Sequence, residues 1–224
     1  MKRWNNNSQI VDLSLPLSKE QARKLELGSI VTVSGLVFTG RSLFHIRAVE
    51  QDLVPPIDFR QINCFFHVGP VMLPDAGGWK VLSIEPTSSI RFEKYAPAVI
   101  RKLKLRTLIG KTTMGPATAR ALAEVGGVHL SKIGICGNQI SQQIVDVQGV
   151  HFLRELGKTE ATWIFEVRRF GPFFVDIDAR GNNYFENQER EKRLHLVEVY
   201  RQLGIPEGYE YTSVESGSRG SWKS

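Results

Sequence analysis

Residues 105–116 read LRTLIGKTTMGP. The apolar run 105–109 predicts a short buried strand, and Pro116 predicts the first turn of a helix, where a residue without an amide N–H loses no hydrogen bond. Lys111 lies in the loop between them, directly after Gly110. A cation between the end of a strand and the start of a helix is typical of an α/β fold that binds an anion at the edge of its sheet.

Two other segments also place polar residues and a cation after an apolar run. They are TGRS at 39–42 and PTSSIR at 86–91. Strand ends of an α/β sheet meet at one edge, so we expect Arg41, Arg91 and Lys111 to converge there. The hydroxyls of the second segment would add donors for the same anion. The sequence therefore predicts one anion site built from three loops.

Each segment also has a simpler explanation. Lys111 fits a phosphate-binding loop only in part, because that motif needs a glycine five residues before Gly110 and this chain has Leu105 there. A surface lysine in a strand-to-helix loop would explain the same residue. Thr87-Ser88-Ser89 would be N-capping residues of a helix if they occurred alone. Their occurrence together with the other two segments favours the anion site.

The remaining pattern predicts mixed sheets covered by helices, which is an α/β fold. We expect helices at 18–27, 43–53, 116–125, 138–145 and 185–203. We expect strands at 29–36, 63–68, 80–84, 105–109, 132–136, 151–156, 163–170 and 173–177. A single domain is expected to span 13–212, between a flexible segment at 1–12 and a flexible tail at 213–224.

Composition narrows the class of partner. The 224 residues carry a formal net charge of +6, which is compatible with nucleic acid, a membrane surface or an acidic molecule. The basic cluster at 101–106 has no interleaved aromatic residues to stack on bases, so no nucleic-acid partner is expected. No apolar run approaches the roughly 20 residues of a membrane span, and no secretory signal follows Met1. We therefore expect a cytoplasmic protein with no membrane partner.

The cysteines and histidines indicate neither a metal site nor a nucleophile. Cys64 and Cys136 each lie in an apolar run, which predicts buried, reduced thiols. The five histidines show no metal-ligand spacing, so no metal site is expected in this chain. The sequence has no Gly-x-Ser-x-Gly elbow, and neither cysteine has an evident base partner, so nucleophilic catalysis is unsupported.

Five short motifs occur in one order along the chain. They are Thr39-Gly40-Arg41 with His45, His67-Val68-Gly69-Pro70, Pro86-Thr87-Ser88-Ser89 with Arg91, Gly110-Lys111 with Met114-Gly115-Pro116, and Phe170-Gly171-Pro172 with Asp178 and Gly181-Asn182-Asn183. Their order and spacing, from about 13 to 203, resemble the β subunit of class I fumarate hydratases and L-tartrate dehydratases. The resemblance implies a swivelling β/β/α domain. It also implies a hydro-lyase that hydrates fumarate to malate reversibly, or dehydrates tartrate or a related 2-hydroxy dicarboxylate.

The resemblance implies a cofactor and a partner as well. In that family a [4Fe-4S] cluster held by three cysteines binds the substrate and acts as a Lewis acid. This chain has only two cysteines, so the cluster is expected on a separate iron-sulfur α subunit. The partners expected are therefore that α subunit and a small dicarboxylate.

The residues that match the family's substrate contacts have side chains suited to a dicarboxylate. They are Arg41, Thr87, Ser88, Arg91 and Lys111. Removal of a proton next to a carboxylate builds a second negative charge, which fixed cationic donors stabilise most in the transition state. Thr87 and Lys111 are the expected catalytic residues. An unassisted threonine is a poor base, so either Thr87 or a carboxylate of the α subunit takes the proton.

The chain departs from the family pattern at four positions. It has Ser42 where the family commonly has aspartate, Ser88 where it has a second threonine, and Thr112-Thr113 where it has two glycines. The β-branched pair restricts the backbone and adds bulk beside Lys111, which leaves the identity of the substrate open. The alternative function is a non-catalytic module that keeps the fold and binds an anion or a protein partner.

Overall fold

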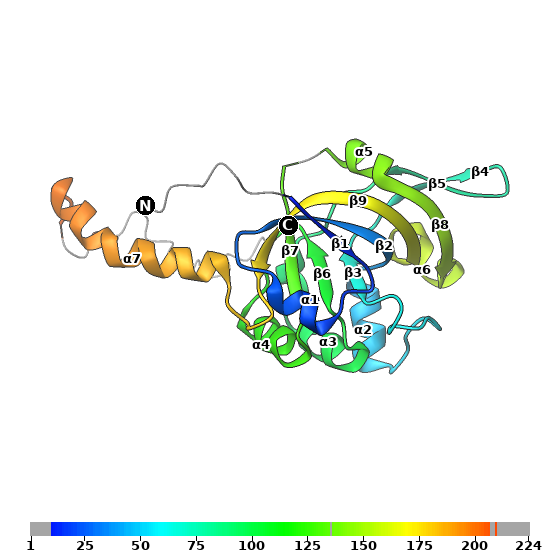
Figure 1. Ribbon diagram of the computed structural model, residues 1–224, viewed down its shortest axis with the longest axis horizontal. Coiled ribbons are helices and arrows are strands. Elements are labelled where there is room, and N and C mark those ends of the chain that lie inside the picture. Colours follow the sequence, from blue (N-terminus) through cyan, green and yellow to red (C-terminus); the bar gives the residue numbers. More distant parts are fainter. Residues whose placement is uncertain (1–9, 135, 207–208, 210–224) are drawn as a thin grey trace, which may run out of the picture. The chain divides into compact units, whose positions relative to one another are not determined.

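The computed structural model describes residues 10–134, 136–206 and 209 (Figure 1). It divides into two units, Met1–Phe185 and Glu186–Ser224. Most of the segment 1–12 and all of the tail 213–224, both expected to be flexible, lie outside the described residues. The first unit contains the whole sheet and all five predicted site residues.

A seven-stranded sheet has the order β1-β2-β3-β6-β7-β9-β8. Its strands are β1 (Val11–Ser14), β2 (Ile30–Gly40), β3 (Cys64–His67), β6 (Thr107–Gly110), β7 (Val128–Lys132), β8 (Ile144–His151) and β9 (Thr162–Ile177). Strands β1, β2, β3, β6 and β7 are parallel, and β9 is antiparallel to β2, β7 and β8. Because β9 pairs with both β7 and β2, the strands β2, β3, β6, β7 and β9 close into a ring.

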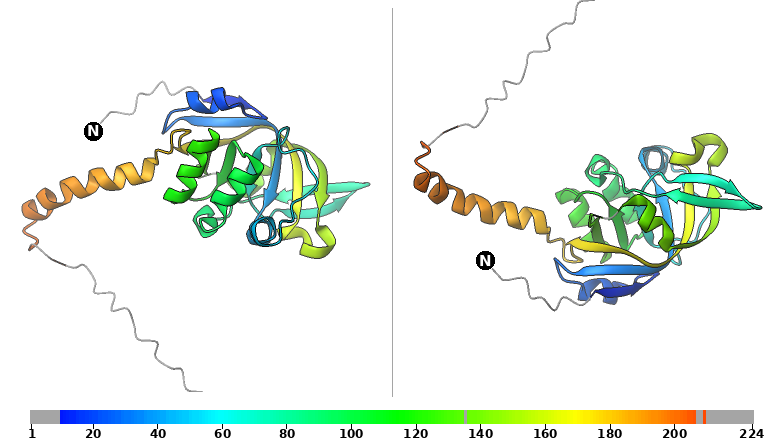
Figure 2. Two further views of the ribbon diagram at one scale, coloured as in Figure 1. Left: turned by 90° about the horizontal axis from the view of Figure 1, so that it is seen from below. Right: turned by 90° about the horizontal axis from the view of Figure 1, so that it is seen from above.

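Helices cover one face of this sheet, and α2, α3 and α4 lie side by side on it (Figure 1). The helices are α1 (Lys19–Lys24), α2 (Ser42–Glu50), α3 (Ala96–Leu103), α4 (Pro116–Val125), α5 (Gly137–Ile140), α6 (Leu153–Glu160) and α7 (Tyr184–Gln202), with 3-10 turns η1 (Ser89–Phe92) and η2 (Ser141–Gln143). A separate hairpin of β4 (Val71–Asp75) and β5 (Gly78–Ser83) extends beyond the sheet in both views of Figure 2. None of the described helices is both long enough and apolar enough to cross a membrane.

Alternation along the short strands divides the apolar side chains between two cores. Cys64, Phe66 and Ile109 belong to the core on one side of the sheet. Phe65 and Leu108 point the other way and pack with the helices that cover the sheet. His67 has the parity of Phe65, so its ring lies on the helix side, at the carboxyl end of β3.

The sequence predicted several element starts correctly. Ser18 caps α1 with a capping box, in which the Gln21 side chain accepts the Ser18 amide and the Ser18 hydroxyl accepts the Gln21 amide. Pro116 begins α4, and the turn at 75–78 joins β4 to β5. The α/β class is confirmed.

Other predicted elements are wrong in type or extent. The run 151–156 is not a strand: β8 ends at His151, and Phe152 has a positive φ of 62° that turns the chain into α6. The helix predicted at 138–145 is two short turns that end before β8 begins. The strands predicted at 163–170 and 173–177 form one strand, β9. Cys136 is exposed rather than buried, whereas Cys64 is buried as predicted, and both thiols are free.

Candidate functional site

The site lies where three neighbouring parallel strands end. Gly40 of β2 is paired in register with His67 of β3, and β6 ends at Gly110 beside β3. The loops that leave these strands begin with Arg41 and Lys111 on either side of β3. The structure therefore brings these two predicted cations to one edge of the sheet, as expected for the carboxyl ends of parallel strands.

The segment that carries Thr87 bridges two of these strand ends. The Thr87 amide donates to the His67 carbonyl at 2.7 Å, and the Lys111 amide donates to the Thr87 carbonyl at 3.1 Å. Pro86 also forms a bridge with Val68. The backbone of Thr87 thus links the end of β3 to the residue that follows β6. These two hydrogen bonds hold Thr87 next to Lys111. Thr87 is half-buried and Lys111 is exposed, which suits groups at the wall of an open site.

Ser88 and Arg91 follow directly, but not as the sequence suggested. The predicted N-capping run leads into η1, a 3-10 turn of four residues in which Ser88 makes no side-chain cap. Arg91 is exposed, and its amide donates to the Ser88 carbonyl at 3.4 Å. Its guanidinium forms no hydrogen bond or ion pair with the other predicted site residues in the described part of the chain. The backbone therefore places Arg91 near the site without fixing its charged group there.

Arg41 is held by a residue that sequence reasoning missed. Its guanidinium lies 3.7 Å from a carboxylate oxygen of Glu160, and the two side chains are only 25% and 19% exposed. The other oxygen of Glu160 accepts the Leu43 amide at 3.0 Å, in the first turn of α2. A Cβ on Gly69 would stand 2.9 Å from Arg41 Cδ, so this glycine leaves room for the arginine. Nothing in the local sequence around Glu160 indicates this role, because the pair is brought together by the fold.

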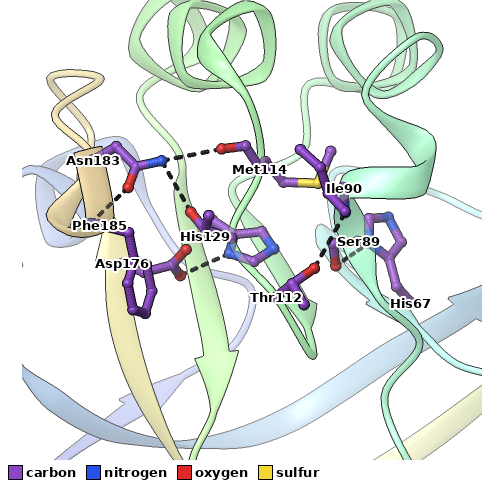
Figure 3. A network of polar contacts seen from close by, with 10 residues as sticks. His67, Ser89, Ile90, Thr112, Met114, His129, Asp176, Asn183 and Phe185 are labelled. Carbon is purple, nitrogen blue, oxygen red and sulfur yellow. Dashed lines mark hydrogen bonds and ion pairs between the residues drawn. The ribbon is translucent and has the colours of Figure 1, made fainter. Parts of the chain in front are cut away.

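Buried polar side chains gather around Ser89, two residues after Thr87, and Figure 3 shows His67, Ser89, His129 and Asp176 among them. His45 Nε2 is 3.2 Å from His67 Nε2, and His67 Nδ1 is 2.8 Å from the Ser89 hydroxyl. His129 Nδ1 is 2.7 Å from Asp176 Oδ1, with both side chains fully buried. Burial lowers the pKa of His45 to about 3 and lowers that of His67, which the neighbouring His45 and His129 lower further. His45 and His67 are therefore neutral at ordinary pH.

Two further contacts brace the loop that follows Lys111. Thr112 Oγ1 accepts the Ile90 amide at 3.4 Å, which links the loop to η1. Asn183 donates to Thr113 Oγ1 at 2.9 Å and to the Met114 carbonyl at 3.0 Å (Figure 3). Thr112 and Thr113 thus each have a partner for the hydroxyl.

Glu93 holds the start of α4 on the other side of this loop. Its carboxylate accepts the Gly115, Ala117 and Thr118 amides at 2.8, 2.9 and 3.0 Å. It also accepts the Thr118 hydroxyl at 2.6 Å. The sequence held an indirect signal for this contact, since α4 begins at Gly115-Pro116 with no side chain able to cap its own amides.

A cavity of about 780 Å³ opens elsewhere, near the residues that precede β3 and β6, where Asn63 and Arg106 are among its lining residues. None of the predicted site residues lines it.

Comparison with known proteins shows the family of this chain. The model of the family described as Fumarase C-terminus matches residues 1–188. The chain belongs to the fumarase C-terminus family. A Geobacillus stearothermophilus protein named as a class I fumarate hydratase is 36% identical over 83% of this chain, which spans 35% of that protein.

Two shorter relatives are matched over nearly their whole length. The L(+)-tartrate dehydratase subunit beta of Escherichia coli K12 is 29% identical over 83% of this chain and 93% of its own length. A Methanocaldococcus jannaschii protein with the name of the same subunit is 30% identical over 82% of this chain and 95% of its own length. The chain thus belongs to a family of hydro-lyases, and the name "subunit beta" implies a partner subunit for those relatives.

Proposed function

We propose that this chain is the β subunit of a heteromeric iron-sulfur hydro-lyase that acts on a small 2-hydroxy dicarboxylate. The reversible hydration of fumarate to malate is the first candidate reaction, and dehydration of tartrate or a related acid is its close neighbour. The observation that carries the proposal is the backbone link from His67 through Thr87 to Lys111, at a strand edge that also holds Arg41. Membership of the fumarase C-terminus family supports it.

The residues of this chain would bind the substrate and stabilise its transition state. Arg41 and Arg91 suit the two carboxylates, since guanidinium groups bind them through paired hydrogen bonds. Lys111 would stabilise the charge that builds on a carboxylate when the adjacent carbon loses its proton. Thr87 and Ser88 would place hydroxyls close to the reacting carbon, and either Thr87 or a partner carboxylate would take the proton.

The cluster is proposed to belong to the partner. A [4Fe-4S] cluster with one open iron needs three thiolates, and this chain has two cysteines. Cys64 is buried in β3, where burial raises the pKa of its thiol, and Cys136 is exposed at the start of α5. These residues do not fit such a cluster. An iron-sulfur α subunit in the cytoplasm would supply it. The name "subunit beta" of two relatives supports the existence of a partner subunit.

The experiment is an anaerobic assay of the chain reconstituted with its α subunit, with malate, fumarate and tartrate as substrates. Arg91→Ala and Lys111→Ala should each lower kcat/KM by about 100-fold to 1,000-fold, because each removes one cationic donor of the proposed site. Arg120→Ala, which removes an exposed cation on α4, is the matched control and should leave kcat/KM unchanged.

Two results would count against the proposal. Turnover by the isolated, iron-free chain would overturn the assignment of the cluster to a partner. Normal kinetics in both the Arg91 and Lys111 variants would favour a module that binds an anion or a partner without catalysis.

A further inference from the structure

Ser89 is fully buried and follows Thr87 by two residues. Its hydroxyl is 2.8 Å from His67 Nδ1. The point where a Cβ on Gly110 would stand is 1.6 Å from the Ser89 hydroxyl and 3.2 Å from His129 Nε2. Because Gly110 has no side chain, the Ser89 hydroxyl occupies the space where a Cβ would stand. The ring of His129 borders the same space (Figure 3).

The unpartnered nitrogen of His45 indicates a direction for the hydrogen bonds from His45 to Ser89. His45 Nδ1 is buried and has no partner among the described residues. A buried N–H without a partner is rarer than an unused acceptor, so the neutral His45 ring carries its proton on Nε2 and donates to His67 Nε2. The proton of His67 is then on Nδ1, which donates to the Ser89 hydroxyl. The hydroxyl keeps its own proton for a second acceptor.

His129 lies close to Ser89 but forms a separate pair with Asp176. Its Nδ1 is 2.7 Å from Asp176 Oδ1, and its Nε2 is buried and has no hydrogen-bond partner among the described residues. Both His129 Nε2 and the Ser89 hydroxyl border the space that Gly110 leaves open. The order of donors therefore runs from His45 through His67 to Ser89.

We propose that Ser89 is a positioning residue of the candidate site, which holds Thr87 against the carboxyl end of β3. The proposal rests on the function proposed above. His67 holds this segment by two hydrogen bonds. Its carbonyl accepts the Thr87 amide, and its ring donates to the hydroxyl of Ser89, two residues later. Loss of the Ser89 hydroxyl releases one of the two attachments. Thr87 and, through its carbonyl, the Lys111 amide then lose their fixed position.

Hydrogen exchange in the full chain tests this without any assay of activity. Ser89→Ala should speed the exchange of the Thr87 and Lys111 amides by about tenfold or more relative to amides of the β2–β9 pair. Ser141→Ala is the matched control, because the Ser141 hydroxyl is also at the edge of the core and donates to the Asn138 carbonyl at 2.8 Å. The control should leave the exchange of the Thr87 and Lys111 amides unchanged.

Kinetics in the reconstituted complex give the second readout. Ser89→Ala should lower kcat by about tenfold or more and change KM by less than about twofold, because misplaced reacting groups cost more in the transition state than in substrate binding. Ser141→Ala should leave both constants unchanged.

The outcomes separate this inference from the proposed function. Unchanged exchange of both amides in Ser89→Ala, or faster exchange spread evenly over the whole sheet, would overturn the positioning role whatever the activity. A wild-type complex that turns over none of the three acids would refute the proposed function alone, and the exchange result would still decide the role of Ser89. A raised KM with a normal kcat in Ser89→Ala would also refute the positioning role.

Discussion

At the scale of single residues, the neutral pair His45 and His67 makes the fold sensitive to acid. The pKa of His45 is lowered from 6.5 to about 3 by burial, and that of His67 is lowered as well. Below about pH 6.5 the unfolded chain binds protons on these rings that the folded chain does not bind. Their contribution to stability is therefore complete above pH 6.5 and is lost as the pH falls toward 3.

Replacement of His45 with asparagine should flatten this dependence. Between about pH 6 and pH 4, each buried histidine adds about 1.4 kcal/mol per pH unit to the slope of unfolding free energy against pH. Denaturant titrations of the wild type and of His45→Asn at several pH values should differ by about that slope. His195→Asn, which changes an exposed histidine of α7, should keep the wild-type slope. Equal slopes for all three proteins would show that His45 is protonated in the folded chain.

The sequence predicted the position of a residue correctly where that position depends on the neighbouring residues in the chain. Lys111 and Arg41 follow strand ends, and that position alone places them at one edge of the sheet. Glu160 and Ser89 could not be found this way, because their partners lie far along the chain and are buried by tertiary packing. His45, His67 and His129 are buried, whereas the sequence indicated only that the histidines lack the spacing of metal ligands. Their order as donors and acceptors depends on distances that only the fold supplies.

At the scale of elements, α4 depends on a carboxylate from outside the helix. Glu93→Gln keeps the shape of the side chain but turns one acceptor oxygen into a donor that faces the amides of α4. We expect it to lower the free energy of unfolding by about 1–3 kcal/mol, measured by denaturant titration. Glu124→Gln removes an exposed carboxylate that pairs with Arg101, and should cost less than about 1 kcal/mol. Similar losses in the two variants would contradict a clamp at Glu93.

Element prediction failed mainly around β7, β8 and β9. His129 interrupts the apolar run of β7, so the strand was placed four residues too late. Gly171-Pro172 looked like a break between two strands, yet β9 continues through it by pairing with different neighbours on each side. The predicted bounds of two helices agree within one residue with the observed bounds, 116–125 and 184–202. Each of these helices has a clear apolar face or a clear start in the sequence.

At the scale of the whole molecule, the family match and the first structural unit end close together. The match covers residues 1–188, and the first unit ends at Phe185. A chain that stops after Gln188 should therefore keep the thermal midpoint of the full chain within about 2 °C, since both cores lie inside the first unit. Calorimetry of the two chains checks this. A drop of more than about 5 °C would mean that the second unit stabilises the first.

Closure of the ring of strands depends on β9, which is the last of these strands to be synthesised. β2 leaves the ribosome early, but its partner along most of its length is β9, where Ile30 faces Phe174 and Val37 faces Phe165. Until the chain has been translated through Ile177, β2 has an unpaired edge that can associate with other chains. The ring of strands cannot close before β9 has been translated, because β9 is the strand that pairs with both β2 and β7.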